Sequence, residues 1–552
     1  NRVSSKMFAE LSIEVFIANK IKVYFFEEIL PMPELSFSVP FLNADLGIEI
    51  TASHNEKNYN GFKIIMQNGS SPSKNEKDQI KDEIFGNKNK KITTITMKDV
   101  KRFDIKNKKS NKLFIISYKK SLKNMLSRQI IEEKYLQKII RQIIQPNIIN
   151  NNIDKLHIAY CSFNGTGINI IPKLFNKLKI KNWKNISSLS QIDPLFSKFN
   201  YNQILDPGDQ SNTKLIISEL LKEYGVETTA KLDLIMCNDP DSDRLSIIIK
   251  TENNSSNYKD WRLLTGDEMW IILLWYRLKH WSKKSLFLKN KEKMFITKSF
   301  VTTDSLKSIT KNNGIDCYDS EVGFSEQSQK VVNCWEKNKI NLGMFEESNG
   351  FSISGGKNDN SYGIYKHILE KDGILSTALI IEVYAYAKSL NLTMYDLLKK
   401  IYLETDLNFY INQKKDFSQK KQFDGLSGDL EKRKIIIEIE KFVKIVNLSK
   451  KKKYYFNNIP ITSTKIFKTG KYDDKYWKNF PDEGIRFYLN NSKTDHVTIR
   501  SAGTEPKIRI FVQYKIKRIT KNNFDKIKEI QIVKNIISDV ENILKTMLLK
   551  NS

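Results

Sequence analysis

Apolar runs and amphipathic patterns alternate along the first three quarters of the chain. Ala9, Ile13 and Phe16 recur at helical spacing on one face. Pro31 begins a second helical pattern, since proline suits the first turn of a helix. Short apolar runs, which predict strands, occupy residues 22–26, 46–50, 156–160, 232–236, 294–297 and 341–345. This order predicts successive βαβ units and an α/β fold.

The pattern changes from about residue 405. There, Ile508, Ile510 and Val512 alternate with polar residues, which predicts a strand with one buried face, and a helical pattern follows from about 524 to 547. This last part is α+β in style. An asparagine-rich stretch, residues 147–152, predicts a linker, and 552 residues predict three or four domains.

The chain is strongly basic, with 91 Lys and Arg against 63 Asp and Glu and a formal net charge of +28. Such a charge would suit nucleic acid, a membrane surface or a phosphorylated small molecule. Much of the excess, however, is lysine beside asparagine and isoleucine throughout, as an AT-rich genome produces, and no nucleic-acid-binding motif accompanies it. No apolar run is long enough to span a bilayer. We therefore expect no membrane partner and no nucleic acid.

The four cysteines form no C-x-x-C pair, which favours buried free thiols in a reducing compartment. No signal peptide is recognisable, so we expect a cytoplasmic protein. The chain begins with asparagine, and residues 1–20 have the pattern of a helix from the middle of a domain. We therefore expect an incomplete N-terminus.

The first candidate site is T-A-S-H-N, residues 51–55, which directly follows a predicted strand. Ser53 is thus expected on a loop at a strand end, where α/β folds present reactive groups. The turn signal N-G-F-K follows and ends in Lys63. A Ser-His pair alone is a weak signal, because most such pairs are surface loop residues.

The second candidate is N-D-P-D-S-D-R, residues 238–244. Side chains alternate along an extended loop, so Asp239, Asp241 and Asp243 are expected on one side. Converging carboxylates repel each other unless a cation joins them, and all-oxygen ligation suits Mg²⁺. The glycine and distal glutamate of an EF-hand are absent. An acidic turn without metal is the alternative, and Pro240 and the preceding strand favour the metal site.

The third candidate is E-E-S-N-G, residues 346–350. A carboxylate and a hydroxyl two residues apart, Glu346 and Ser348, can bind adjacent sugar hydroxyls. Such a pair more often caps a helix, so the signal is weak by itself.

The fourth candidate is R-S-A-G-T-E-P-K-I-R, residues 500–509. A glycine turn offers backbone N–H groups, Thr504 a hydroxyl, and Arg500 and Arg509 guanidinium groups that can bind a phosphate. A basic turn alone says little, because arginines usually lie at the surface.

Together and in this order, the four motifs resemble the α-D-phosphohexomutase superfamily, which contains phosphoglucomutases and phosphomannomutases. The resemblance covers nearly the whole chain, and P-E-L-S-F at 33–37 is similar to the branch of phosphoglucomutases and phosphopentomutases. It implies three related α/β domains with mixed sheets and a C-terminal α+β phosphate-binding domain, around a central cleft. The expected domains are residues 1–152, 153–290, 291–404 and 405–552.

The resemblance implies an isomerase, an intramolecular phosphotransferase that interconverts glucose 1-phosphate and glucose 6-phosphate. Phosphorylated Ser53 would bind one Mg²⁺ with Asp239, Asp241 and Asp243, and glucose 1,6-bisphosphate would be the intermediate and activator. His54 or Lys371 would transfer protons; Lys371 belongs to a K-D-G stretch that also resembles the family. The phosphorylated sugar would be bound by Lys63, Arg244, Glu346, Ser348, Arg500, Gly503, Thr504 and Arg509. The expected assembly is a monomer or a homodimer.

The sequence departs from the family at several points. Ala502 stands where the family usually has serine, Ser325 stands where many members have lysine, and the N-terminal F-G-T-x-G-x-R-G segment is absent. Two alternatives within the family are a phosphopentomutase and a sugar-bisphosphate synthase. An alternative of another class is a catalytically degenerate basic binding protein.

Overall fold

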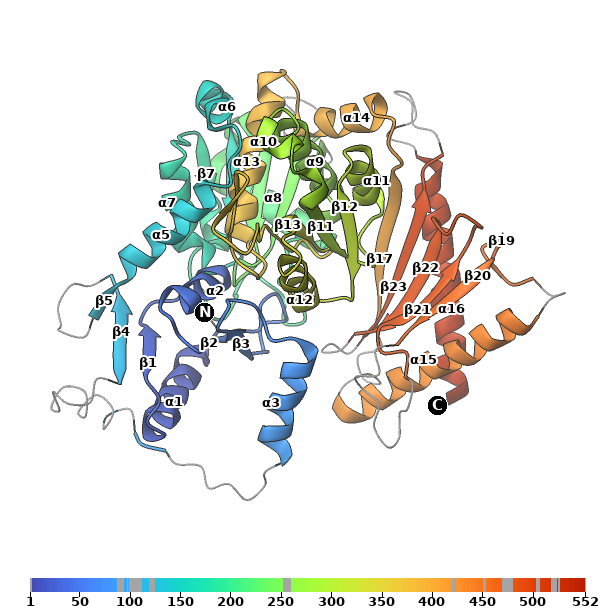
Figure 1. The fold of residues 1–552 in the computed structure, drawn as a ribbon, viewed down its shortest axis with the longest axis horizontal. Coiled ribbons are helices and arrows are strands. Elements are labelled where there is room, and N and C mark those ends of the chain that lie inside the picture. The colour runs from blue at the N-terminus through green and yellow to red at the C-terminus, as the bar shows by residue number, and fades with distance from the viewer. Residues whose placement is uncertain are drawn as a thin grey trace. The chain divides into compact units, whose positions relative to one another are not determined.

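The structure is a computed structural model of the chain. It describes residues 2–86, 94–96, 98, 112–118, 125–251, 260–418, 423, 425–449, 453–468, 480–502, 507–517, 524 and 527–551. These residues form two compact units (Figure 1). The first comprises Asn1–Lys298, Gly314–Tyr318 and Gly323–Leu398, and the second comprises Ser299–Asn313, Asp319–Val322 and Lys399–Ser552.

Helices and strands alternate along the first half of the chain. Its N-terminal part contains α1 (Ser5–Ala18), β1 (Val23–Phe26), α2 (Met32–Phe41), β2 (Leu46–Ile50), β3 (Phe62–Met66), α3 (Lys74–Gly86), β4 (Leu113–Ser117), β5 (Met125–Ser127), α5 (Arg128–Ile140) and α6 (Pro146–Asn151). There follow β6 (Ile158–Cys161), α7 (Gly167–Lys177), β7 (Trp183–Asn185), α8 (Gln210–Lys231), β8 (Leu234–Asn238), β9 (Leu245–Lys250), β10 (Trp261–Leu263), α9 (Gly266–Trp281) and α10 (Ser285–Leu288).

The next elements are β11 (Met294–Ser299), α11 (Ser305–Asn312), β12 (Asp316–Ser320), α12 (Phe324–Trp335), β13 (Ile340–Phe345), β14 (Phe351–Ser352), β15 (Asn360–Ser361), β16 (Ile364–Tyr365), α13 (Gly373–Ser389) and α14 (Met394–Glu404). The C-terminal part contains β17 (Tyr410–Ser418), α15 (Gly425–Leu448), β18 (Tyr455–Phe456), β19 (Ile459–Pro460), β20 (Ser463–Phe467), β21 (Gly484–Tyr488), β22 (His496–Ser501), β23 (Lys507–Lys515) and α16 (Lys528–Asn551).

Each of three sheets before residue 400 contains strands that pair in parallel. Strands β1, β4 and β5 pair in parallel. The sheet β10-β9-β8-β6-β7 is mixed, with β8, β6 and β7 parallel and β9 antiparallel to β8. In the sheet β12-β11-β13-β14, β13 is parallel to β11 and antiparallel to β14. The predicted α/β fold with mixed sheets is confirmed, because helices such as α7 and α12 lie between strands that pair in parallel.

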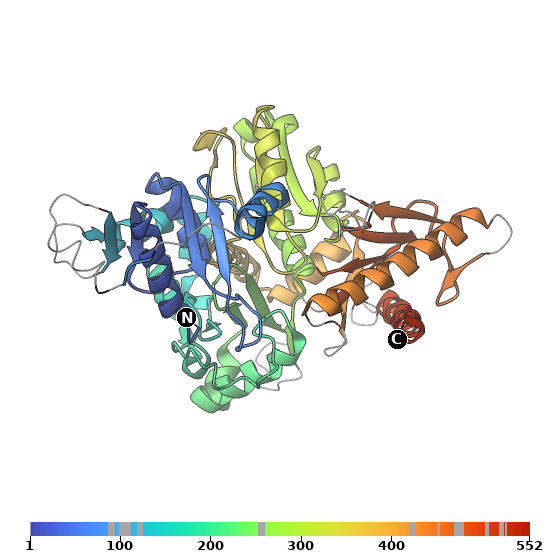
Figure 2. The same ribbon diagram turned by 90° about the horizontal axis from the view of Figure 1, so that it is seen from below.

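A separate antiparallel hairpin, β2 and β3, contacts α1 and is drawn in blue beside it in Figure 2. Its register pairs Ile50 with Phe62. The loop that joins the two strands therefore begins at Thr51 and contains the predicted serine.

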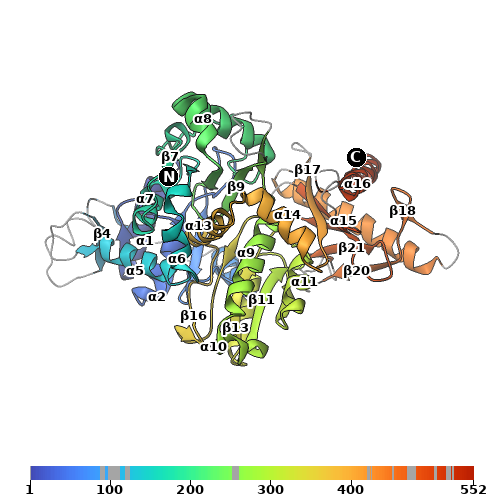
Figure 3. The ribbon, with the colours of Figure 1, turned by 90° about the horizontal axis from the view of Figure 1, so that it is seen from above.

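Helix α13 is the centre of the first unit's core. All but its last two residues are buried, as expected for a helix that is apolar all round. It packs against α5, α6, α9 and the strands β8 and β9 (Figure 3). Asp372 caps its N-terminus by accepting hydrogen bonds from the N–H groups of Ile374 and Leu375, at 2.9 and 2.8 Å. This cap fixes the backbone of the adjacent Lys371.

The second unit contains the antiparallel sheet β17-β23-β22-β21-β20. Helices α15 and α16 pack on this sheet, and residues such as Ile436 and Val533 join its buried strand residues in one core. The alternating residues Ile508, Ile510 and Val512 lie in that core, as predicted. The α+β prediction for the C-terminal part is confirmed.

The structure differs from the sequence-based expectation at two helices. The asparagine-rich stretch is not a linker loop: it forms α6, with Ile149 buried. The last helix begins at Lys528 rather than 524 and extends to Asn551. The asparagine-rich stretch has no periodic apolar pattern of its own, and α6 packs against α13.

Within the described part of the chain, no single helix is long and apolar enough to cross a membrane. Helices α13 and α14 meet that criterion only as a pair, bent by 79°. The four cysteines all lie among the described residues and form no disulfide; Cys161, Cys237 and Cys334 are buried and Cys317 is half-buried.

Candidate active site

Ser53 lies in the loop after β2, as the sequence predicts, and its φ of +50° is in the left-handed region. The Ser53 N–H donates to Thr51 Oγ1 at 2.9 Å, and the Thr51 N–H donates to the Gly61 carbonyl at 3.0 Å, which closes the loop. The Ser53 Oγ lies 3.0 Å from Asp239 Oδ2 and 3.1 Å from Asp241 Oδ1. The loop therefore presents the serine hydroxyl to the second predicted motif.

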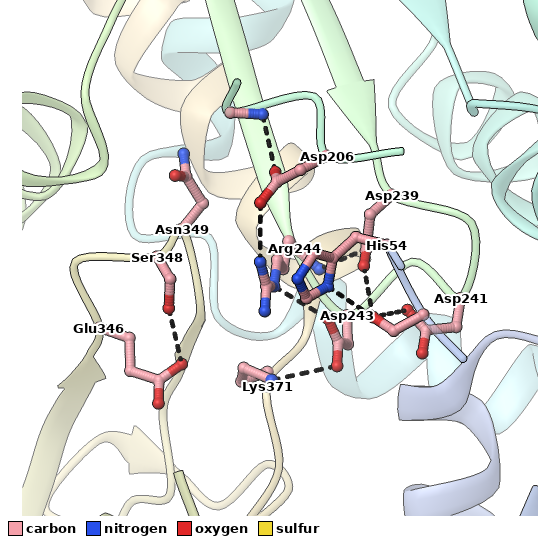
Figure 4. A network of polar contacts seen from close by, with 12 residues as sticks. His54, Asp206, Asp239, Asp241, Asp243, Arg244, Glu346, Ser348, Asn349 and Lys371 are labelled. Atoms are coloured by element: carbon pink, nitrogen blue, oxygen red, sulfur yellow. Dashed lines mark hydrogen bonds and ion pairs between the residues drawn. The ribbon is translucent and has the colours of Figure 1, made fainter. Parts of the chain in front are cut away.

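The aspartates come from the turn between β8 and β9 (Figure 4). One carboxylate oxygen from each of Asp239, Asp241 and Asp243 lies within 4.8 Å of the others, and all three residues are buried. The sequence predicts this convergence from alternation along an extended loop, and that reason is wrong. Ser242 has a φ of +61° and donates its N–H to the Asp239 carbonyl at 2.9 Å, so a tight turn brings the carboxylates together.

The surroundings of these carboxylates shift their pKa values in opposite directions. Burial, together with the charges of Asp241 and Asp243, raises the pKa of Asp239 well above its usual value. Burial also acts to raise the pKa of Asp243, but the charges of Lys371 and Lys63 outweigh it and hold that pKa well below its usual range.

The donor set fits a divalent cation. Ser53 has one hydroxyl proton for two carboxylates, and no described residue donates a hydrogen bond to the buried Oδ1 of Asp243. Carboxylate oxygens gathered in this way are the ligands that Mg²⁺ prefers. A cation would also offset the repulsion that helps to raise the pKa of Asp239.

Two lysines pair with the aspartates. Lys63 Nζ lies 2.6 Å from Asp241 Oδ2 and 3.4 Å from Asp243 Oδ2, and Lys371 Nζ lies 3.2 Å from Asp243 Oδ2. Burial acts to lower the pKa of both lysines, but the neighbouring carboxylates outweigh it, so both pKa values are raised. Both side chains are therefore held as cations.

His54 is the second candidate for proton transfer, beside Lys371. Its Nδ1 lies 3.3 Å from the Ser53 Oγ. At this distance the ring nitrogen can exchange a proton with the hydroxyl, in a direction that its tautomer decides. The predicted pairing of Ser53 with His54 thus has the geometry for proton transfer.

Arg244 is oriented by a turn at residues 205–208. Its Nη1 donates to Asp206 Oδ2 at 3.0 Å, and Asp206 Oδ1 accepts the Gly208 N–H at 2.9 Å (Figure 4). Burial acts to lower the pKa of Arg244, but Asp206 and the other nearby carboxylates raise it. The Leu205 N–H donates to the His54 carbonyl at 2.8 Å. One turn therefore contacts both the serine loop and Arg244.

Glu346 and Ser348 lie side by side after β13. The Ser348 Oγ donates to Glu346 Oε2 at 3.4 Å, and the Trp270 indole N–H donates to the Glu346 carbonyl at 2.7 Å. Burial raises the pKa of Glu346, although Lys371 acts to lower it. A buried carboxyl group beside a hydroxyl can bind neighbouring hydroxyls of a ligand.

The second unit carries the arginines of the fourth motif. Arg500 and Arg509 are Cα partners on β22 and β23. Arg500 Nη2 lies 3.7 Å from Glu483 Oε2, and Arg509 Nε lies 3.4 Å from Asp416 Oδ1. Two guanidinium groups thus project from adjacent strands that lead into and out of the glycine turn.

That turn is only partly described. Gly503 and Thr504 lie outside the described residues. Ala502 is buried, and its N–H donates to the Lys507 carbonyl at 3.0 Å, which joins the two strands next to the turn.

Three family models match the chain. They describe α/β/α domains I, II and III of phosphoglucomutase/phosphomannomutase and match residues 1–91, 133–252 and 265–402, well over half of the chain together. The chain belongs to the α-D-phosphohexomutase superfamily. Phosphoglucomutases and phosphomannomutases are phosphotransferase isomerases, and this phosphohexomutase is an enzyme of that class.

Individual relatives are distant but cover most of this phosphohexomutase. A phosphopentomutase of Pongo abelii is 24% identical over 526 residues, which are 92% of this chain and 74% of that protein. A phosphoglucomutase of Staphylococcus aureus (strain MSSA476) is 24% identical over 536 residues, 95% of this chain and 82% of that protein. The open form of Paramecium parafusin, a phosphoglucomutase, superposes with a TM-score of 0.62 at 16% identity, covering 99% and 86% of the two chains, which shows the fold.

The first unit of this phosphohexomutase brings together most of the residues that the sequence singled out. They are Ser53, His54, Lys63, Asp239, Asp241, Asp243, Arg244, Glu346, Ser348 and Lys371. Arg500 and Arg509 belong to the second unit.

Sequence reasoning missed Asp206 and Arg2. The D-P-G-D sequence at 206–209 predicts a turn, but it does not indicate that Asp206 binds Arg244. Arg2 donates to the Ser53 carbonyl at 2.7 Å. A single arginine ahead of a helix gives no local signal for such a contact.

Proposed function

We propose that the protein is a phosphoglucomutase that interconverts glucose 1-phosphate and glucose 6-phosphate through phosphorylated Ser53. The observation that carries this proposal is the position of the Ser53 Oγ, 3.0 and 3.1 Å from two buried carboxylates and 3.3 Å from His54. Burying so many charges around one hydroxyl is costly for a fold. Buried charges around a serine hydroxyl are therefore expected where they take part in phosphoryl transfer.

In the proposed reaction, phosphorylated Ser53 gives its phosphoryl group to the free hydroxyl of the sugar phosphate. The bond between phosphorus and the serine oxygen breaks, and a new bond to the sugar oxygen forms as the sugar hydroxyl loses its proton. The product, glucose 1,6-bisphosphate, reorients, and its other phosphoryl group returns to Ser53. The sum of the two transfers is an isomerisation that needs no co-reactant.

Ser53 in its phosphorylated form would hold one Mg²⁺ together with Asp239, Asp241 and Asp243. When bound, the ion would offset charge on the transferring phosphoryl group and, through Asp243, lower the pKa of Lys371. Lys371 would take the proton of the sugar hydroxyl in the first transfer and return it in the second. His54 would donate a proton to the serine oxygen in the first transfer and accept it in the second.

The sugar and its second phosphate would be held by other residues. Glu346 and Ser348 would bind ring hydroxyls in either orientation of the sugar. Lys63 and Arg244 would add positive charge near the reacting phosphate. The turn with Arg500, Gly503, Thr504 and Arg509 would bind the phosphate that is not transferred. We also propose domain boundaries near residues 152, 290 and 404.

A phosphopentomutase is the second candidate, because relatives of both kinds match at the same identity. A sugar-bisphosphate synthase would use the same serine with another phosphoryl donor. A degenerate binding protein is disfavoured, because binding alone does not require a serine hydroxyl within hydrogen-bonding distance of two buried carboxylates.

The test is a mutase assay of the purified chain with Mg²⁺ and glucose 1,6-bisphosphate. The Ser53→Ala variant should keep less than about a hundredth of the activity, because no nucleophile replaces the serine. Ser12→Ala, which alters a half-buried serine of α1 outside the Ser53 loop, is the control and should behave as wild type. Near-normal turnover by Ser53→Ala would refute the phosphoserine mechanism. The ratio of kcat/KM for glucose 1-phosphate and ribose 1-phosphate decides between the two candidate substrates.

A further inference from the structure

The loop that carries Ser53 is held by one buried arginine. Arg2 lies just before α1 and is 5% exposed. Its Nη1 donates to the carbonyls of Glu56 and Tyr59, at 2.7 and 2.8 Å. Its Nη2 donates to the carbonyls of Ser53 and Asn55, at 2.7 and 2.8 Å. A single guanidinium group thus binds four carbonyl oxygens of one loop.

The residues that follow Arg2 contact the two ends of the same loop. The Ser5 Oγ donates to the carbonyl of Ile50, the last residue of β2, at 3.1 Å. At the other end, the Asn60 Nδ2 lies 3.1 Å from Ser4 Oγ and 3.2 Å from Ser5 Oγ. The start of α1 and the segment before it therefore bind the loop along its whole length.

The backbone conformation of Ser53 explains why the loop needs these contacts. A φ of +50° is unfavourable for serine and persists only where surrounding contacts impose it. The contacts of the Ser53 side chain with Asp239, Asp241 and His54 cannot impose it throughout a cycle, because they change when the oxygen gains or loses a phosphoryl group. Contacts to the backbone carbonyls do not involve the oxygen that gains or loses the phosphoryl group.

We propose that Arg2 is a positioning residue, which holds the Ser53 loop so that the oxygen faces the aspartates in both the free and the phosphorylated enzyme. This inference rests on the proposed mutase function. It does not give Arg2 contact with substrate. The guanidinium group is suited to the task because its planar fork directs N–H groups toward several acceptors, whereas a lysine presents one nitrogen.

Arg128 offers a matched comparison. It is also buried, at 1% exposure, and donates to the carbonyls of Glu28 and Ile29 and to the carboxylate of Glu34. None of these acceptors belongs to the serine loop. A substitution there tests what the loss of a buried arginine does to the fold in general.

The experiment compares Arg2→Lys, Arg2→Ala and Arg128→Lys with wild type in steady-state kinetics and thermal unfolding. For both Arg2 variants, kcat should fall by about tenfold to a hundredfold while KM for glucose 1-phosphate stays close to wild type, as expected for a misplaced reacting group. Arg128→Lys should lower Tm and leave kcat unchanged. Millimolar guanidinium chloride, against equal sodium chloride, should raise kcat of Arg2→Ala several-fold and leave the other variants unaffected.

Hydrogen exchange of the backbone amides of residues 53–61 provides a readout that is independent of turnover. These amides should exchange faster in Arg2→Ala than in wild type, and at the wild-type rate in Arg128→Lys. Unchanged exchange, or a kcat loss that guanidinium does not relieve and that Arg128→Lys shares, would overturn the role of Arg2. If wild type itself shows no mutase activity, the proposed function fails, and exchange alone decides whether Arg2 holds the loop.

Discussion

The substitution Asp241→Asn tests the metal site at the aspartates. The carboxylate oxygens lie within 4.8 Å of one another, and at an effective dielectric constant of about 20 two charges at that limit repel each other by about 3.5 kcal/mol, and by more when closer. Lys63 and Lys371 offset part of this repulsion through their ion pairs. A divalent ion should offset the rest, so Mg²⁺ is expected to stabilise the folded protein.

The size of this stabilisation follows from mass action. Mg²⁺ at a hundred times its Kd should add about 2.7 kcal/mol to the free energy of unfolding. If Asp241→Asn weakens binding about a hundredfold, the same concentration adds only about 0.4 kcal/mol. Thermal unfolding of the chelator-treated protein, with magnesium chloride against sodium chloride of equal ionic strength, measures the difference.

The exposed Asp154→Asn is the control and should respond to Mg²⁺ as wild type does. The stabilisation by Mg²⁺ should also weaken as the pH falls. Because the pKa of Asp239 is raised, protons compete with the ion for this carboxylate. A stabilisation of Asp241→Asn by Mg²⁺ as large as that of wild type would refute the assignment of the carboxylates as its ligands.

Three further predictions concern residues around this site and in the core. Asp206→Asn should lower kcat/KM about tenfold, because Arg244 loses a charged hydrogen-bond partner; steady-state kinetics with an unchanged kcat/KM would contradict the orienting role of Asp206. Lys371→Met should lower kcat by about a hundredfold or more and should weaken the pH dependence of kcat if the lysine transfers a proton. Burial and neighbouring lysines lower the pKa of His280 to about 4 from 6.5, so the unfolded state binds the proton more readily than the folded state between these values. Stability should therefore fall as the pH drops from 6.5 toward 4, and denaturant titrations should show a smaller fall in His280→Phe.

Short-range patterns in the sequence predicted the elements and motifs well. Ser53 and the three aspartates directly follow β2 and β8, because an apolar run ending in polar residues marks a strand end. The three aspartates converge because the backbone of Ser242 is in the left-handed region, and no hydrophobic pattern predicts that conformation.

Features made by distant contacts were not predictable in this way. The segment just before the asparagine-rich helix α6 is held by a distant residue, because Glu382 of α13 accepts the N–H groups of Ile144 and Gln145, at 2.9 and 2.6 Å. The charge of Lys371 depends on Asp243, which lies far away in the sequence. The contacts of Arg2 likewise involve a loop about fifty residues later in the chain.

The measurement that tests the central claim most directly is the intact mass of the purified protein before and after incubation with glucose 1,6-bisphosphate and Mg²⁺. The proposed mechanism predicts the added mass of one phosphoryl group, located on Ser53 by peptide mapping and lost when glucose 1-phosphate accepts it. A protein that gains no phosphoryl group on Ser53, or one that does not pass it to the sugar phosphate, would contradict the mechanism.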